Sequence, residues 1–170
     1  MDYPKVYSLK DKNASHYIKN HLIKLIKNNE NNEFLDIFKN NEEVLQKADL
    51  TKVFQEACLC GNVEIVKFLF SCNLNYLIDF EFPYIESDPP HQPEVKNGAI
   101  FLACENHSVD LLEYFLRNEL YYIDSETQRY LEMFMSSALP IIDKIEHKLY
   151  LEETMKVCQD SSGSIKKQKI

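Results

Sequence analysis

Glycine and proline are scarce in this sequence, which has 3 Gly and 6 Pro among 170 residues. Because the hairpins of β-sandwiches and β-barrels depend on such turn residues, the composition argues against an all-β fold. The three glycines, Gly61, Gly98 and Gly163, lie far apart, so the chain contains neither G-x-G-x-x-G nor the P-loop motif. The scarcity favours a helical fold without the common phosphate-binding loops.

Long apolar runs and an excess of positive charge are missing as well. No run reaches the roughly 18 residues needed to cross a bilayer, and residues 1–8 lack the apolar core of a secretory signal. The 19 basic and 27 acidic residues give a formal net charge of -8, which disfavours nucleic acids and anionic membranes as partners. We therefore expect a soluble, cytoplasmic protein.

The cysteines give little sign of a disulfide framework or a metal site. An odd number at irregular spacing suits reduced thiols, and the five are Cys58, Cys60, Cys72, Cys104 and Cys158. Cys58 and Cys60 are two apart in a helical pattern, so they point about 200° apart. Cys104 and His107 could share a helix face, but no second pair completes four zinc ligands. We expect buried thiols, no metal and no cofactor.

Apolar residues recur at helical spacing along most of the chain. Asn-rich or Gly-Asn breaks at 28–32, 40–41 and 61–62 divide the pattern into short helices. A helix is expected to open at Ser125, and Pro140 lies near the start of a last amphipathic helix. We expect residues 1–158 to form one domain and residues 159–170, which are polar and basic, to form a disordered tail.

Residues 79–96 differ in composition from the rest of the chain. Four prolines and five acidic residues fall in this stretch, so it cannot be a helix interior. Phe80, Phe82 and Tyr84 alternate with Asp79, Glu81 and Pro83, as in an extended segment. Two interpretations remain open. The aromatic residues either anchor a partner within an acidic rim or cover an exposed edge of the core.

Two segments of the chain repeat one another. Residues 57–70, ACLCGNVEIVKFLF, align with residues 103–116, ACENHSVDLLEYFL. Ala-Cys, then Val-acidic-apolar-apolar, then an apolar end recur in register. Self-similarity of this length is the signature of a repeat architecture.

The first of these segments resembles the ankyrin repeat. ACLCGNVEIVKFL, at 57–69, is similar to that family's pattern AAxxGHLEIVKLL. The resemblance implies an all-α, short ankyrin-like solenoid of antiparallel helix pairs, with weaker pairs near 22–38 and 131–155 as helical caps. Ala57 and Ala103 are 46 positions apart, and a repeat of about 33 residues therefore leaves an insertion at about 79–96. His107 replaces the turn glycine, so it must take an unfavourable backbone conformation or a different turn.

The resemblance also implies a function in protein binding. Ankyrin-like stacks bind partners on their concave side, and the matching exposed positions of the first helices are Gln55, Leu59, Cys60, Phe101, Glu105 and Asn106. The composition of the insertion adds Phe82, Tyr84, Glu86 and Asp88. We expect a monomer that binds another protein, one with a basic surface.

Two other classes of function remain as alternatives. An enzyme needs converging groups, but His16 and His21 point about 140° apart on one helix, and Cys104 with His107 lacks an orienting partner. We therefore expect no catalytic residues. A secreted effector of an intracellular pathogen, acting in host cytoplasm, is the other class. Residues 151–154, LEET, followed by a Ser/Lys-rich tail, resemble the tail signals of some type IV secretion effectors.

Overall fold

The structure, a computed structural model, describes residues 13–46, 48–72, 74, 78–80, 98–118, 120–121, 123 and 125–165. Within these residues all regular secondary structure is helical, as the composition predicts. The helices are α1 (Ala14–Lys27), α2 (Asn31–Asn40), α3 (Glu42–Leu45), α4 (Thr51–Leu59), α5 (Val63–Ser71), α6 (Gly98–Glu105), α7 (Val109–Arg117), α8 (Ser125–Phe134) and α9 (Leu139–Ile165). Among them, none has the length and apolar character that a bilayer crossing requires.

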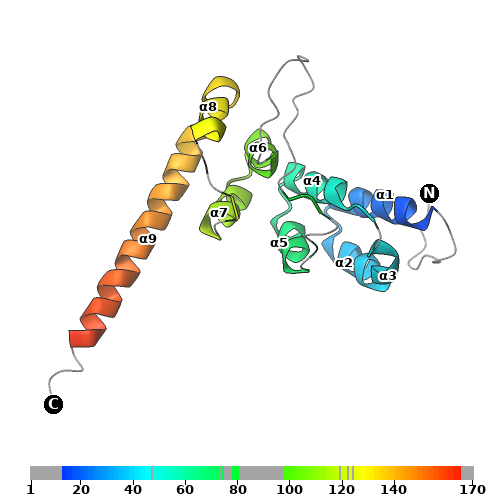
Figure 1. The fold of residues 1–170 in the computed structure, drawn as a ribbon, viewed down its shortest axis with the longest axis horizontal. Helices are drawn as coiled ribbons and strands as arrows, with labels where there is room; N and C mark the ends of the chain where they lie inside the picture. Colours follow the sequence, from blue (N-terminus) through cyan, green and yellow to red (C-terminus); the bar gives the residue numbers. More distant parts are fainter. Residues whose placement is uncertain are drawn as a thin grey trace.

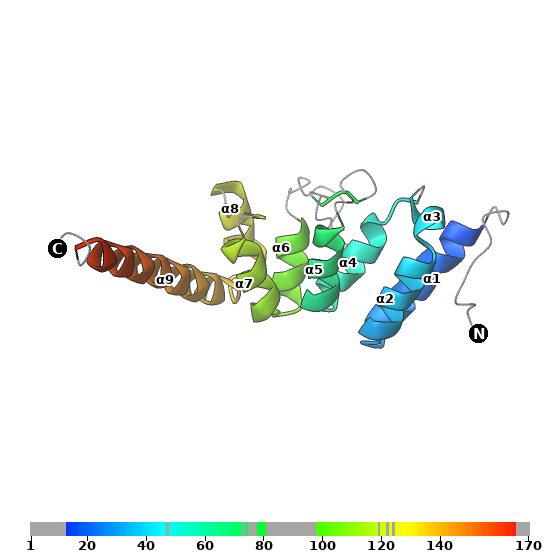
Figure 2. The same cartoon turned by 90° about the horizontal axis from the view of Figure 1, so that it is seen from below.

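The helices are arranged as antiparallel pairs that lie side by side (Figure 1, Figure 2). The first helices of successive pairs pack on one another, α1 on α4 and α4 on α6. The second helices α5 and α7 are also in contact, and α9 packs on α7. The stacking buries one apolar face of each helix, because a single pair is too small to bury its own.

Three of the tight turns have the same backbone geometry. Asn29, Gly61 and His107 have φ values of 58°, 62° and 51°, in the left-handed region. At each turn this residue's amide donates to the carbonyl three residues back, and the next amide donates to the carbonyl five residues back. The expectation of an unfavourable backbone at His107 is thus confirmed. The break predicted at 28–32 contains the equivalent residue of the first pair.

The turns also touch one another, which fixes the register of the stack. Asn62 Nδ2 donates to Asn31 Oδ1 at 2.7 Å, joining the first and second turns. A Cβ atom added to Gly61 would lie 2.8 Å from Ser108 Oγ and 2.9 Å from Asn106 Nδ2. Gly61 therefore serves both the left-handed conformation and the close approach of the third turn.

An aromatic cluster fills the space between the second and third pairs. Phe70 stacks on Phe80 with ring centroids 4.4 Å apart, and Phe54 meets Phe80 edge to face at 4.9 Å. The backbone amide of Asp79 donates to Thr51 Oγ1 at 2.9 Å. Phe80, at the start of the 79–96 stretch, thus covers the core. This agrees for Phe80 with the interpretation that the aromatic residues cover an exposed core edge.

Helix α9 is longer than the sequence pattern suggests, since it continues to Ile165. The helix thus includes residues 159–165 of the predicted tail, and disorder of that tail stays a prediction. No proline follows Pro140, and each residue added to an existing helix gains a hydrogen bond without a new nucleus. Figure 1 shows α9 running past α7 and away from the other pairs.

Candidate functional site

The left-handed turn residues give a common register for the first helices. Each left-handed residue is preceded by two residues at the end of a first helix. The three turns thus give six residues, and all six side chains are exposed. We call them the first-helix row: Lys27, Asn28, Leu59, Cys60, Glu105 and Asn106. Because the turns contact one another, these residues lie along one edge of the stack, contributed by three helix pairs.

Four of the predicted binding residues belong to this row. Leu59 and Glu105 are the last residues of α4 and α6. Cys60 and Asn106 follow them directly, so the structure brings these four residues together beside the stacked turns. Gln55 lies one helical turn before Leu59 and is half-buried.

Lys27 and Asn28 belong to the row but were not predicted. The signal that could have found them is Asn29, because asparagine tolerates the left-handed conformation better than most residues. Its position would have aligned α1 with α4 and α6.

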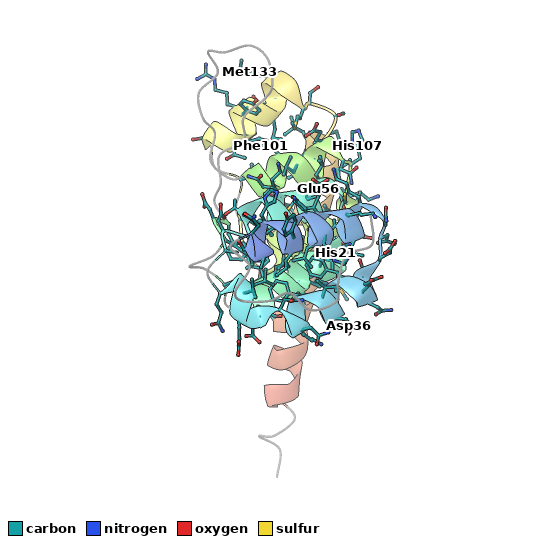
Figure 3. The ribbon with its side chains drawn as sticks, turned by 90° about the vertical axis from the view of Figure 1, so that its right-hand side faces the viewer. His21, Asp36, Glu56, Phe101, His107 and Met133 are labelled. Carbon is teal, nitrogen blue, oxygen red and sulfur yellow. The ribbon has the colours of Figure 1, made fainter. Side chains whose placement is uncertain are left out.

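The predicted exposure of Phe101 is wrong. This residue was expected on the exposed side of a first helix, but it is fully buried. Its ring centroid lies 4.9 Å from that of Tyr130 in α8. Figure 3 shows Phe101 and His107 on opposite sides of the stack, with α8 above them. Helix α8 covers this position, which the local pattern of α6 could not reveal.

The remaining predicted residues, Phe82, Tyr84, Glu86 and Asp88, lie outside the described residues.

An ion pair links the first-helix row to its neighbours. Lys27 Nζ lies 3.3 Å from Glu56 Oε1, which joins α1 to α4. The Lys27 side chain remains 56% exposed, whereas that of Glu56 is 13% exposed. Cys60 Sγ lies 3.8 Å from the same carboxylate oxygen. Partial burial, together with this carboxylate, raises the pKa of the Cys60 thiol. The row therefore combines charged and polar residues with Leu59, and the raised pKa of Cys60 does not favour a thiolate there.

The buried thiols have the environment of core residues. Burial raises the pKa of Cys58 well above its ordinary value and that of Cys104 to about 12. His107 donates its backbone amide to the Cys104 carbonyl oxygen at 3.0 Å, while its side chain is exposed. A raised pKa disfavours the thiolate that nucleophilic or metal-binding cysteines require. No group of three His, Cys, Asp or Glu side chains that could hold a metal occurs among the described residues.

A second surface feature lies between α7 and α9. An open cavity of about 880 Å³ is lined by apolar and aromatic residues, such as Leu116 and Tyr121, and by charged residues, such as Glu146 and Lys156. Arg117 borders it and bridges two carboxylates, Glu113 of α7 and Glu152 of α9, each at 2.7 Å. This bridge, with a 2.8 Å contact from Lys148 to Glu113, holds α9 against α7.

No family model matches the chain, and neither curated proteins nor solved structures give a significant match.

Proposed function

We propose that this chain is a protein-binding module built from ankyrin-like helix pairs, which engages its partner through the first-helix row. The observation that carries the proposal is the shared register of three left-handed turns. It aligns six exposed side chains from three pairs on one edge of the stack. Such a surface, continuous across repeats, is what repeat proteins use for binding.

The packing of α4 and α6 supports the ankyrin-like assignment. Ala57, Cys58, Ala103 and Cys104 are all buried on the two first helices. Small side chains at these positions let adjacent first helices approach closely, while larger residues such as Ile65 and Leu111 fill the space around the second helices.

The proposal also includes the stretch at 79–96. Phe80 belongs to the aromatic cluster, and we assign partner contacts to Phe82, Tyr84, Glu86 and Asp88. Their acidic members suit a basic region of the partner. In this proposal the module acts as a monomer.

Substitution of Leu59 tests the proposal. Leu59→Asp places a charge in the centre of the row, and Leu151→Asp on α9 is its matched control, because the two leucines are 40% and 46% exposed. We expect affinity capture with quantitative mass spectrometry to lose the specific partner for Leu59→Asp and to keep it for Leu151→Asp. The melting temperatures of the two variants should agree. Capture of the same proteins by Leu59→Asp and by the unaltered chain would contradict the proposal.

A further inference from the structure

The first-helix row has a charge order that neither the fold nor the resemblance requires. The residue two positions before the left-handed residue is Lys27 in the first turn, Leu59 in the second and Glu105 in the third. The row thus carries a lysine at α1, a leucine at α4 and a glutamate at α6. Lys27 pairs with Glu56 Oε1 at 3.3 Å, and its side chain remains 56% exposed. Helix α1 carries three lysines and no acidic residue, in a chain whose net charge is -8.

The spacing of the helices sets the spacing of a ligand that crosses them. Packed helices lie about 8–10 Å apart. A polyproline II segment advances about 3.1 Å per residue with three residues per turn, so every third side chain points the same way at intervals of about 9 Å. In a β-strand, residues three apart would point to opposite faces. Polyproline II geometry therefore matches the row.

We propose that the partner docks a polyproline II segment of the pattern acidic-x-x-apolar-x-x-basic across the row. This inference rests on the proposed function and adds the chemistry of the partner. The acidic side chain lies at Lys27, the apolar one on Leu59 and the basic one at Glu105. Charge complementarity chooses this order over its reverse, because like charges placed together disfavour binding.

The neighbouring positions suit the same ligand. A polyproline II backbone makes no internal hydrogen bonds, so its carbonyl and amide groups need partners. The side-chain amides of Asn28 and Asn106 are exposed at the two ends of the row. Asn28 Nδ2 donates to Glu30 Oε1 at 2.9 Å, and Asn28 Oδ1 can accept a hydrogen bond from a backbone amide of the ligand.

Nuclear magnetic resonance titration with a designed peptide tests the inference. The probe is the acetylated heptapeptide Glu-Pro-Pro-Leu-Pro-Pro-Lys, and its control is Glu-Lys-Pro-Leu-Pro-Pro-Pro, which has the same composition but the wrong spacing. We expect saturable shifts at the backbone amides of residues 27–29, 59–61 and 105–107, with affinity at least about threefold higher for the matched peptide. Equal affinities for the two peptides, or shifts outside these residues alone, overturn the inference.

Double-mutant cycles then test the charge order. Lys27→Gln is combined with Glu→Gln in the peptide, and Glu105→Gln with Lys→Gln in the peptide. Each matched pair should show coupling of about two- to fivefold in affinity at low salt, because exposed ion pairs are weak. The crossed pairs should show none. Coupling in the crossed pairs, or in neither pair, overturns the proposed order.

The two proposals can fail separately. Loss of partner capture by Leu59→Asp without coupling in the cycles keeps the binding module and overturns the ligand pattern. Retention of capture by Leu59→Asp together with matched coupling overturns the row as the partner's site, while the row's preference for this peptide pattern stands.

Discussion

At the scale of single residues, the same backbone conformation is held by three different side chains. Asn29, Gly61 and His107 all have positive φ. The left-handed region costs a residue with a Cβ atom about 1–2 kcal/mol, whereas glycine adopts it freely. The backbone of the third turn therefore carries a conformational free-energy penalty that the second turn lacks. The packing around His107 maintains the shared geometry despite this penalty.

Replacement of His107 by glycine should relieve that cost. We expect His107→Gly to raise the free energy of unfolding by about 1 kcal/mol in urea denaturation, since the His107 side chain is exposed. The control is His107→Ala, which removes the imidazole but keeps the backbone penalty and should leave stability nearly unchanged. Equal stabilisation by both variants would show that the imidazole, not the backbone, is the source.

The reciprocal change at Gly61 should destabilise. Gly61→Ala meets the backbone penalty and also places its Cβ 2.8 Å from Ser108 Oγ, so the third turn must shift. Its cost should therefore exceed the gain from His107→Gly.

At the scale of elements, local patterns predict the helices and their breaks well. Short stretches of sequence determine the turn at Gly61, the break at 28–32 and the unfavourable backbone at His107, because turn geometry depends on a few neighbouring residues. The exposure of Leu59 and Glu105 follows from the same helical period.

Positions covered by distant elements could not be predicted in this way. Phe101 corresponds in register to Ile23 and Gln55, both only half-buried, and it is buried because α8 brings Tyr130 onto it. That contact depends on how the chain returns after α7. Helix α9 continues through a polar stretch to Ile165, because a polar composition alone does not end a helix.

Phe80 separates the two interpretations of the stretch at 79–96. Phe80→Ala removes a ring from the cluster with Phe54 and Phe70. It should cost about 2–3 kcal/mol of unfolding free energy, less than a fully buried phenylalanine, because Phe80 is half-buried. The paired variant Phe82→Ala/Tyr84→Ala should keep the melting temperature and weaken partner capture. A large fall in melting temperature for the pair would instead assign these rings to the core as well.

At the scale of the whole molecule, the two ends of the stack carry ionisable groups whose pKa values are lowered for different reasons. His21 is buried in α1. Burial lowers its pKa, an effect that Lys24 assists and that Glu33 and Glu30 oppose. At the other end, hydrogen bonds from Lys148 and Arg117 lower the pKa of Glu113. Helix α1 packs on α2, α3 and α4, whereas α9 packs on α7, so a change at one end can act locally.

The signs of these shifts predict a polarised acid transition. The unfolded state binds a proton at His21 near its ordinary pKa of 6.5, before the folded state does, so stability is complete above that pH and falls as the pH drops toward the lowered value. The contribution of Glu113 is complete above its ordinary pKa of 4.5 and is lost only below it. Hydrogen exchange should therefore show protection lost first in α1 and α2 as the pH falls below 6.5, and at lower pH between α7 and α9. His21→Gln should remove the first step, whereas His147→Gln, on the exposed face of α9, should retain it. Simultaneous loss of protection at both ends would mean that the stack unfolds as one cooperative unit, in which neither group acts locally.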